Sequence, residues 1–378
     1  MTSKICIAHG MNIGFRSGGT NRVLVFAKAL AENGYDVSLV VPKPVGKIPE
    51  DIIDIIKIYT VPIKPKRSVI NQIPRALSVA LKAKKIAEKE KAILQIEHST
   101  LGGIAALLGC SNYILDVHDL EFDGSLYKSI PLAPKVIYYL ERKAVSKALK
   151  VIVVSEPMKE FLVENWKVSE EKVTVIPNGC EVERIKPSEK EIEGLISFIG
   201  VLHHEIDYEK MIELAKSVNE NTKIYIIGDG PMKDKFAKMI KNEKLKNIIL
   251  MGFLPFPENN KAYEILAHSQ VCIAPLKSTL HVRMASTVKT FTYAALGKAI
   301  AMDRDGSAII FERNNAALVS DPAKTEEFIE NVHKLLEDKN LRRKLGENAR
   351  KLVKAFTWEK QGERLVKMYE KKWSYNEN

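Results

Sequence analysis

Short apolar runs that alternate with helix-length segments are the feature that most limits what this chain can fold into. In the first half, the apolar runs lie at residues 4–8, 37–41, 93–96, 113–115 and 151–154. The segments between them that have helical spacing of apolar residues lie at 22–33, 74–90 and 133–148. Strands that are buried on both faces have continuous apolar sequence rather than alternation. The pattern therefore predicts a parallel sheet covered by helices.

The second half of the chain repeats this alternation, with predicted strands at residues 196–199, 223–227, 248–251, 271–274 and 299–302. Because 378 residues exceed what one hydrophobic core ordinarily holds, we expect two domains. A Pro-Asn-Gly turn ends the first half, and we place the hinge near residues 183–193. The predicted fold class is α/β, with two Rossmann-like, doubly wound parallel-sheet domains (1–183 and 184–356) that face a ligand cleft.

The net charge of +11 raises the question of an anionic partner. Nucleic acid is not expected, because no recognition motif is present and the lysines of residues 82–91 alternate with glutamates, as on a solvated helix face. Residues 63–75 mix basic and apolar side chains without an acid, as a segment that rests on an anionic membrane surface would. We find no signal peptide and no run near the roughly 18 apolar residues of a membrane span. We therefore expect a cytoplasmic protein, with peripheral attachment to the inner face of the membrane as a further hypothesis.

The four cysteines lie far apart in the sequence and in no metal-binding spacing, so we predict single buried or semi-buried thiols in a reducing compartment.

Two glycine-rich turns are candidates for ligand contact. Gly18 and Gly19 come between the first predicted strand and a helix, where backbone N–H groups suit an anion or a sugar hydroxyl. Gly228 and Gly230 follow the strand at 223–227 in the same way. The GxGxxG fingerprint of dinucleotide enzymes is absent, so NAD is not expected. Ordinary tight turns would use the same glycines, and the residues alone leave both interpretations open.

Ionisable residues gather where the strand at 113–115 ends. Asp116 and His118 alternate on one face and Asp119 begins the loop, so we predict that they point into the cleft as catalytic groups. Histidine, or a partly desolvated carboxylate, is the usual general base near neutral pH. Glu97 and His98 end the preceding strand and are expected to line the same site. The alternative is a capping aspartate beside a surface histidine.

A cationic helix start is predicted in the second half. Lys289 begins a helix-like segment together with Thr290 and Thr292, and Arg283 lies shortly before it. A cation beside helix-start N–H groups suits a departing diphosphate, on which negative charge builds. The alternative is a solvated surface lysine.

Taken in order, the motifs resemble those of GT-B fold glycosyltransferases, close to the family 4 group. The resemblance covers nearly the whole chain and rests on Gly18-Gly19, His118-Asp119, Leu140-Glu-Arg142, Ile176-Pro-Asn-Gly179, Gly228-Asp-Gly-Pro231, Tyr293-Ala-Ala-Leu-Gly-Lys298 and Phe356-Thr-Trp358. It implies a hexosyltransferase that moves a sugar from a nucleotide-sugar donor to a glycan or lipid-linked acceptor in cell-surface polysaccharide or glycoconjugate synthesis. It also implies that no metal and no cofactor are needed, and that a closing helix at 357–373 packs on the N-terminal domain.

Two departures from the family pattern concern the donor site. The family's Gly-Arg…Lys-Gly signature, whose cations hold the donor diphosphate, is replaced by residues 200–208, which lack both cations. The two glutamates that the family usually carries eight positions apart are replaced by Met284 and Thr292. The pattern looks instead like a subgroup resembling the glucuronosyltransferase of xanthan synthesis. That likeness implies that Lys289 takes over the diphosphate contact, and it leaves the stereochemical outcome open.

The resulting hypothesis divides the substrates between the two domains. The donor base and ribose are expected near Gly228, Gly230, Phe253 and Thr292, and the diphosphate at Lys289. The acceptor is expected near Gly18 and Gly19, with Asp116, His118 or Asp119 as a base or as electrostatic support. Two alternatives remain: a nucleotide-sugar epimerase of the same architecture, or a non-catalytic subunit that binds a nucleotide sugar.

Overall fold

The computed structural model describes residues 3–14, 18–63, 69–128, 130–183, 185–254 and 261–373. The chain forms two compact units. Unit 1 comprises Met1–Gly179, Met284–Ser286 and Trp358–Asn378, and unit 2 comprises Cys180–Arg283 and Thr287–Thr357. The division falls directly after the Pro-Asn-Gly turn, a few residues before the predicted hinge. Ser17 and the basic residues 64–68 lie outside the described ranges.

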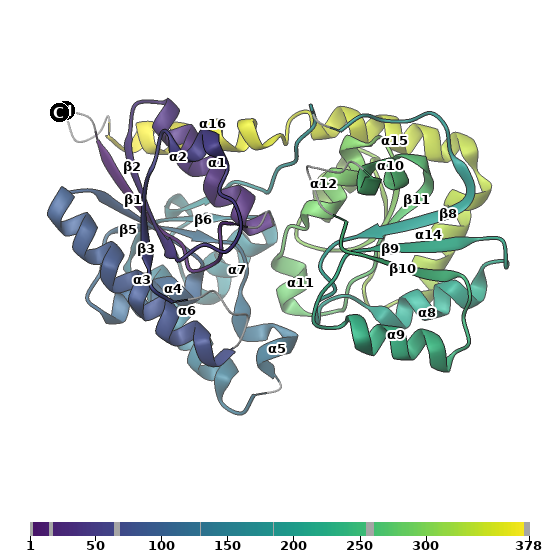
Figure 1. Ribbon diagram of the computed structural model, residues 1–378, viewed down its shortest axis with the longest axis horizontal. Helices are drawn as coiled ribbons and strands as arrows, with labels where there is room; N and C mark the ends of the chain where they lie inside the picture. The colour runs from purple at the N-terminus through teal and green to yellow at the C-terminus, as the bar shows by residue number, and fades with distance from the viewer. Residues whose placement is uncertain are drawn as a thin grey trace. The chain divides into compact units, whose positions relative to one another are not determined.

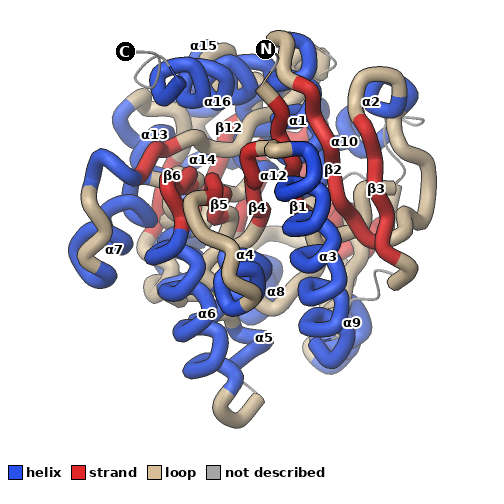
Figure 2. The backbone as a smooth tube through the Cα atoms, turned by 90° about the vertical axis from the view of Figure 1, so that its left-hand side faces the viewer, coloured by secondary structure: helices blue, strands red, loops and turns tan. Residues whose placement is uncertain are grey.

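Unit 1 is built on a seven-stranded parallel sheet with the strand order β3-β2-β1-β4-β5-β6-β7 (Figures 1 and 2). Its strands are β1 (Lys4–Ala8), β2 (Asp36–Pro42), β3 (Lys57–Val61), β4 (Ile93–Glu97), β5 (Tyr113–Val117), β6 (Ala148–Val153) and β7 (Val173–Val175). Its helices are α1 (Gly18–Glu32), α2 (Glu50–Ile53), α3 (Val69–Glu90), α4 (Ser99–Leu107), α5 (Ser125–Lys128), α6 (Ala133–Lys147), α7 (Glu156–Trp166) and α16 (Trp358–Trp373). Two 3-10 turns, η1 (Glu121–Asp123) and η2 (Glu170–Lys172), complete the described elements. The strand order runs outward from β1 and β4 in both directions, which is the doubly wound arrangement that was predicted.

Helix starts differ most from the sequence-based prediction. α1 begins at Gly18 rather than at residue 22, so both glycines belong to the helix itself. α3 begins at Val69 and contains Pro74, which was predicted as its first residue. Pro74 lies in the second turn of this 22-residue helix, where it removes one backbone N–H donor.

The C-terminal helix α16 packs against α1 within unit 1 (Figure 1). A Cβ atom placed on Gly362 would lie 2.7 Å from the Cβ of Ala29, so the glycine permits the close approach of the two helices. Leu365, Val366 and Tyr369 of α16 are buried in the hydrophobic core of unit 1. The last segment of the chain therefore completes the N-terminal domain, as the family resemblance implied.

Unit 2 contains a six-stranded parallel sheet with the order β10-β9-β8-β11-β12-β13. Its strands are β8 (Ile192–Ile199), β9 (Lys223–Ile227), β10 (Ile248–Gly252), β11 (Ser269–Ala274), β12 (Ala299–Asp303) and β13 (Leu318–Ser320). Its helices are α8 (Tyr208–Ser217), α9 (Lys233–Asn242), α10 (Lys261–His268), α11 (Leu280–Met284, whose last residue is grouped with unit 1), α12 (Val288–Ala295), α13 (Ala308–Arg313), α14 (Thr325–Glu337) and α15 (Lys339–Val353). All five strands predicted for the second half are present.

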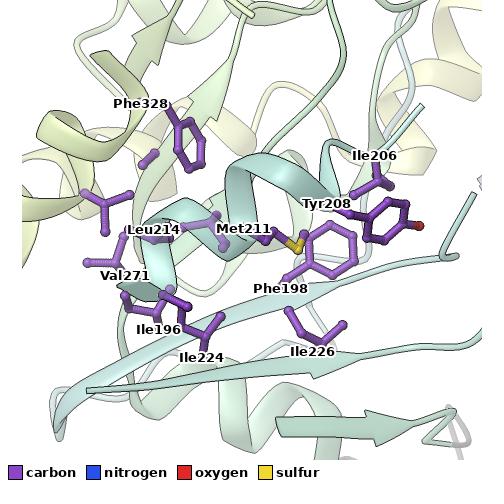
Figure 3. Close-up of a cluster of buried hydrophobic side chains, with 14 of the residues drawn as sticks. Ile196, Phe198, Ile206, Tyr208, Met211, Leu214, Ile224, Ile226, Val271 and Phe328 are labelled. Carbon is purple, nitrogen blue, oxygen red and sulfur yellow. The ribbon is translucent and has the colours of Figure 1, made fainter. Parts of the chain in front are cut away.

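One face of the unit 2 sheet is covered by α8 and α14 (Figure 3). Phe198 and Ile226 of the sheet contact the layer that contains Met211 and Phe328, and all four side chains are fully buried. The ammonium of Lys210 lies 2.7 Å from a carboxylate oxygen of Asp303 inside this layer. This buried pair ties α8 to the end of β12.

Among the described residues, no helix is both long and apolar enough to cross a bilayer. All four cysteines are buried thiols, as the sequence predicted.

Candidate functional site

The carboxyl ends of β4 and β5 bring the predicted ionisable residues of unit 1 together. Parallel pairing sets Glu97 of β4 directly beside Asp116 of β5, and His118 follows one residue after β5 ends. Glu97 and Asp116 are fully buried, and His118 is 7% exposed. The structure therefore brings these residues together at one strand edge, and they lie inside the unit rather than on its surface.

Arg22 of α1 neutralises Asp116, a contact that the sequence did not reveal. Its Nε and Nη2 atoms donate to the two carboxylate oxygens at 2.8 and 2.9 Å, with both side chains fully buried. Nη1 donates to the carbonyl of Pro177, and the guanidinium lies 4.5 Å from the ring centre of Phe26. The one available signal was an arginine within the otherwise apolar stretch of α1. Because both oxygens of Asp116 are engaged, its position argues against a role as general base.

His118 is held between two carboxylates. Its Nε2 lies 2.9 Å from Oε2 of Glu97 and 3.4 Å from Oδ2 of Asp116. Burial alone would lower the pKa of His118, but the charges of Asp116 and Glu97 outweigh it and raise the pKa to about 9. Burial would raise the pKa of Asp116, but Arg22 and His118 hold it well below its usual value. The imidazole is therefore a cation near neutral pH, with N–H donors on both ring nitrogens.

The second ring nitrogen of His118 faces the start of α1. A Cβ atom placed on Gly19 would lie 3.5 Å from His118 Nδ1, so the glycine leaves room for the ring. Within the described part of the chain, no hydrogen-bond acceptor contacts this Nδ1. Gly18 and Gly19 are half-buried at the helix start. A polar N–H beside a helix N-terminus is a suitable contact for an electronegative group of a substrate.

Two further histidines, His98 and then His9, follow His118 in a row. The ring of His98 lies 4.3 Å from that of His118, and the ring of His9 lies 5.7 Å from that of His98. Burial, followed by the charge of His118, lowers the pKa of His9 to about 3 and that of His98 well below its usual value. His98 directly precedes α4 and has a positive φ of 74°. The structure thus keeps two histidines neutral beside one that is charged.

Asp119 is half-buried in the loop after β5, and Glu141 of α6 fixes this loop. One carboxylate oxygen of Glu141 accepts from the hydroxyl of Ser99 and from the backbone N–H of Glu121, both at 2.7 Å. Burial, with a contribution from Glu121, raises the pKa of Glu141 to about 8. The Leu140-Glu-Arg142 motif therefore has a defined structural role, which is to hold the loop that carries Asp119.

Glu97, Asp116 and His118 approach one another within 4.8 Å, a spacing that suits a small cation. In this network, however, the guanidinium of Arg22 already occupies both oxygens of Asp116. Gln95 also donates to Oε1 of Glu97 at 2.7 Å. We therefore treat the three residues as an ion-pair network and assign no metal ligands among them.

The glycines of unit 2 are required by crowding of the backbone. Gly228 has φ 145°, and a Cβ atom there would lie 1.9 Å from the carbonyl oxygen of Gly200. A Cβ atom on Gly230 would lie 2.5 Å from the carbonyl oxygen of Leu202. These contacts join the ends of β8 and β9 and explain both glycines without a ligand. They also leave the strand ends free of side chains at these positions.

Lys289 is half-buried in the first turn of α12, where a cation was predicted. Its Nζ lies 5.5 Å from the ring centre of Phe198, and its Cε would be 3.1 Å from a Cβ on Gly200. None of the described carboxylates forms an ion pair with it. Burial lowers the pKa of Lys289 to about 8, against a small opposing effect of Asp305. A partly buried ammonium without an acidic partner is suited to binding an anion, which would supply the missing counter-charge.

The remaining predicted donor-site residues have different environments. Thr290 and Thr292 are buried, and their hydroxyls donate to the carbonyls of Thr287 and Val288 within α12. Arg283 is exposed on α11, and within the described ranges no contact links it to Lys289. Phe253 is 65% exposed after β10. The structure therefore supports Phe253 as an open stacking surface and shows both threonine hydroxyls engaged by their own helix.

Two family profiles match consecutive parts of the chain. The profile described as Glycosyltransferase Family 4 matches residues 16–184, and the one described as Glycosyl transferases group 1 matches residues 181–352. Together they span both units.

Individual proteins are similar over much of the chain. It is 27% identical over 298 residues to UDP-Gal:alpha-D-GlcNAc-diphosphoundecaprenol alpha-1,3-galactosyltransferase of Escherichia coli, covering 72% of this chain and 74% of that protein. It is 28% identical over 243 residues to an uncharacterized glycosyltransferase of Methanocaldococcus jannaschii, covering 60% of this chain and 59%, less than two thirds, of that protein. Sucrose-phosphate synthase from Thermosynechococcus elongatus superimposes with a TM-score of 0.80 at 15% identity, covering 99% of this chain and 100% of that one, which supports the fold alone.

The fold, the ordered motifs and both profiles lead to one conclusion. The chain belongs to the GT-B glycosyltransferases of family 4 and is an enzyme that transfers a sugar from a nucleotide-sugar donor.

Proposed function

We propose that the enzyme transfers a hexose from a UDP-sugar to a lipid-linked glycan acceptor at an anionic membrane surface. The observation that carries the donor assignment is Lys289, a half-buried ammonium without an acidic partner at the start of α12. UDP is favoured because the similar galactosyltransferase of Escherichia coli is named for a UDP-linked donor and a diphosphate-linked lipid acceptor. The two substrates are assigned to different units, the donor to unit 2 and the acceptor to unit 1.

Lys289 supplies the positive charge that a departing nucleotide requires. When the bond between the sugar and the diphosphate breaks, negative charge develops on the diphosphate, and a positioned cation stabilises it more in the transition state than in the ground state. The pKa of about 8 leaves Lys289 mostly protonated near neutral pH, and a bound anion would raise it further. The exposed ring of Phe253 offers a surface for the uracil base.

His118 acts as a cationic hydrogen-bond donor in this proposal. An imidazolium whose pKa is about 9 is a weak proton acceptor at neutral pH, but it stabilises an anionic or electron-rich group well. Asp116 and Arg22 keep the ring in place from inside the unit. If a carboxylate takes the acceptor's proton, Asp119 is the candidate, because it lies in the loop beside His118 and is only half-buried.

An apolar and basic surface on unit 1 supports the membrane assignment. Its exposed apolar residues form two helical stripes, Ile73, Leu77 and Leu81 on α3, and Leu132, Val136 and Tyr139 at and within the start of α6. The residues of α3 before Glu88 include no acid, and the single acid on α6, Glu141, is buried. Helix α4 packs against both helices (Figure 2). Exposed apolar side chains among lysines and arginines bind anionic bilayers.

The donor assignment is tested by thermal shift and by sugar transfer. UDP should raise the melting temperature more than GDP or ADP does, and a UDP-hexose with a polyprenol diphosphate-linked sugar should yield product. Lys289→Met should abolish the UDP shift, whereas Lys216→Met, which alters a surface lysine of the same unit, should not. Conversion of the donor without any acceptor would instead identify an epimerase. UDP binding without transfer to any acceptor would identify a non-catalytic subunit.

The membrane assignment is tested by sedimentation with lipid vesicles. The protein should bind vesicles that contain phosphatidylglycerol and bind pure phosphatidylcholine weakly. Changing Ile73 and Val136 to serine should weaken binding several-fold, while Ile192→Ser, at a residue of unit 2 that is 52% exposed, serves as the matched control. Equal binding by both variants would remove this surface from the proposal.

A further inference from the structure

A chain of buried hydrogen bonds connects the C-terminal helix to His118. The hydroxyl of Tyr369 on α16 donates to Oε1 of Gln95 at 2.6 Å. The amide Nε2 of Gln95 donates to Oε1 of Glu97 at 2.7 Å, and Oε2 of Glu97 lies 2.9 Å from His118 Nε2. Tyr369 and Gln95 are 274 positions apart in the sequence, and both are at most 1% exposed. All four residues belong to unit 1.

The side chains fix which group donates and which accepts in each of these hydrogen bonds. Gln95 turns its N–H group toward Glu97, which favours the ionised carboxylate as acceptor. The phenol of Tyr369 donates to the carbonyl oxygen of Gln95. This hydrogen bond fixes the orientation of the amide, with its N–H group toward Glu97. Ionised Glu97 then accepts from Gln95 with one oxygen and from His118 with the other. Burial and the neighbouring Asp116 raise the pKa of Glu97, whereas His118 and, with a smaller effect, the amide of Gln95 lower it and so favour the carboxylate.

With Glu97 ionised, the charges around His118 balance when the ring is protonated. Two carboxylates, Glu97 and Asp116, face two cations, Arg22 and His118. The other titratable groups that face this network are His9, His98 and Asp119, with Arg75 of α3 acting on His9. His9 and His98 stay neutral, as described above. Loss of the proton from His118 would leave a net negative charge inside the unit, which is costly.

We propose that Gln95 and Tyr369 are positioning residues that hold His118 in its imidazolium form, with Nδ1–H directed at the start of α1. The inference rests on the proposed role of His118 as a cationic donor and extends it to α16. The C-terminal helix then completes the site as well as the core, because its phenol is the outer end of the chain. This role explains why a polar residue, Gln95, occupies a buried position in β4.

The test compares Gln95→Met and Tyr369→Phe with the wild-type enzyme. Both changes keep approximate size; Tyr369→Phe removes one hydrogen bond of the network, and Gln95→Met removes two. The pKa of His118 is measured by NMR of labelled histidine, with His118→Gln used to assign its signals. We expect Gln95→Met to lower that pKa by about one unit, since Glu97 would lose its donor, and Tyr369→Phe to lower it by less. The alkaline limit of the transfer rate should move to lower pH in the same order, with little change near pH 6.

Tyr35→Phe is the matched control, because Tyr35 packs edge-on against Tyr369 with ring centres 5.8 Å apart but lies outside the chain of hydrogen bonds. An unchanged His118 pKa in Tyr369→Phe and Gln95→Met would overturn the proposal, as would an equal shift in Tyr35→Phe. If Gln95→Met does not fold, Tyr369→Phe decides alone. The NMR measurement needs no turnover, so a failure of the proposed reaction would not be mistaken for a failure of this network.

Discussion

The two units share a parallel α/β design but equip the ends of their strands differently. In unit 1, β4 and β5 end in buried ionisable groups, Glu97, Asp116 and His118, which are paired with Arg22. In unit 2, β8 and β9 end in glycine turns at Gly200 and Gly228. Lys289, whose Cε would lie 3.1 Å from a Cβ on Gly200, lacks an acidic partner among the described residues.

This difference indicates two ways to prepare a site for charged chemistry. Unit 1 fixes its charges in advance, so its polar groups are oriented before a ligand arrives. Unit 2 leaves an ammonium partly desolvated, so the ligand itself supplies the missing counter-charge. The first arrangement makes the site inseparable from the stability of the unit. The arrangement in unit 2 lowers the stability of the free protein and favours the binding of an anionic ligand. Mutations of these charged residues should therefore affect the stability of the two units in opposite ways.

The largest effect is expected from breaking the buried pair in unit 1. Asp116→Ala leaves the guanidinium of Arg22 buried and unpaired, which should lower the free energy of unfolding by about 3–5 kcal/mol. All three tryptophans, Trp166, Trp358 and Trp373, belong to unit 1, so tryptophan fluorescence during urea unfolding reports on this unit. Asp36→Ala removes a half-buried partner of the exposed Lys57 and should cost less than about 1 kcal/mol. Similar losses in both variants would contradict a preorganised site.

The next effect is expected at the glycine turns of unit 2. Gly228→Ala should destabilise unit 2 by about 3 kcal/mol or more, because the new Cβ meets the carbonyl of Gly200 and the backbone conformation excludes most side chains. Gly252→Ala is the matched control: φ is 70° and no atom lies within 4 Å of the added Cβ, so about 1 kcal/mol is expected. Calorimetry of both variants measures the difference. Equal losses of stability in the two variants would show that the contact between the ends of β8 and β9 tolerates a side chain.

A smaller effect, on activity rather than stability, is expected at Lys289. Lys289→Met should reduce kcat/KM by tenfold or more, about 1.4 kcal/mol of transition-state stabilisation. The free energy of unfolding should stay the same or rise, since a methionine buries more easily than an ammonium. Steady-state kinetics and urea unfolding of the same preparation test both statements. Loss of stability in this variant would mean that Lys289 has a structural partner in unit 2 after all.

Local sequence patterns predicted the two sheets. They did not predict the contacts of the site that form between residues far apart in the sequence. Apolar runs located both sheets, because strands buried on two faces are continuous in sequence. β13 has three residues, too few to give a periodic signal. The partners of the site are far apart: Arg22 and Asp116 are separated by 94 positions, and Tyr369 reaches Gln95 only after α16 packs beside α1. Asp116 was identified from its strand end, but its burial and its pairing depend on topology. The sequence therefore located His118 without revealing that it is a cation.

The smallest effect distinguishes the units by the sign of their response to pH. The folded-state pKa of His118, about 9, lies above its unfolded value of about 6.5, so its stabilisation is complete below the unfolded value and is lost as pH rises through 9. We expect the unfolding free energy of unit 1 to fall by about 1 kcal/mol between pH 7 and pH 8.

Unit 2 should respond in the opposite direction. The folded-state pKa of Lys289, about 8, lies below its unfolded value of about 10.4, so the unfolded chain binds more protons between them and stability rises with pH. Glu141, with a raised pKa of about 8, acts in the same direction as His118, so His118→Gln is needed to isolate the histidine's share. Tryptophan fluorescence follows unit 1, and calorimetry of wild type and Lys289→Met follows unit 2. The proposed contrast would be wrong if the unfolding free energies of both units changed with pH in the same direction and neither His118→Gln nor Lys289→Met altered that change.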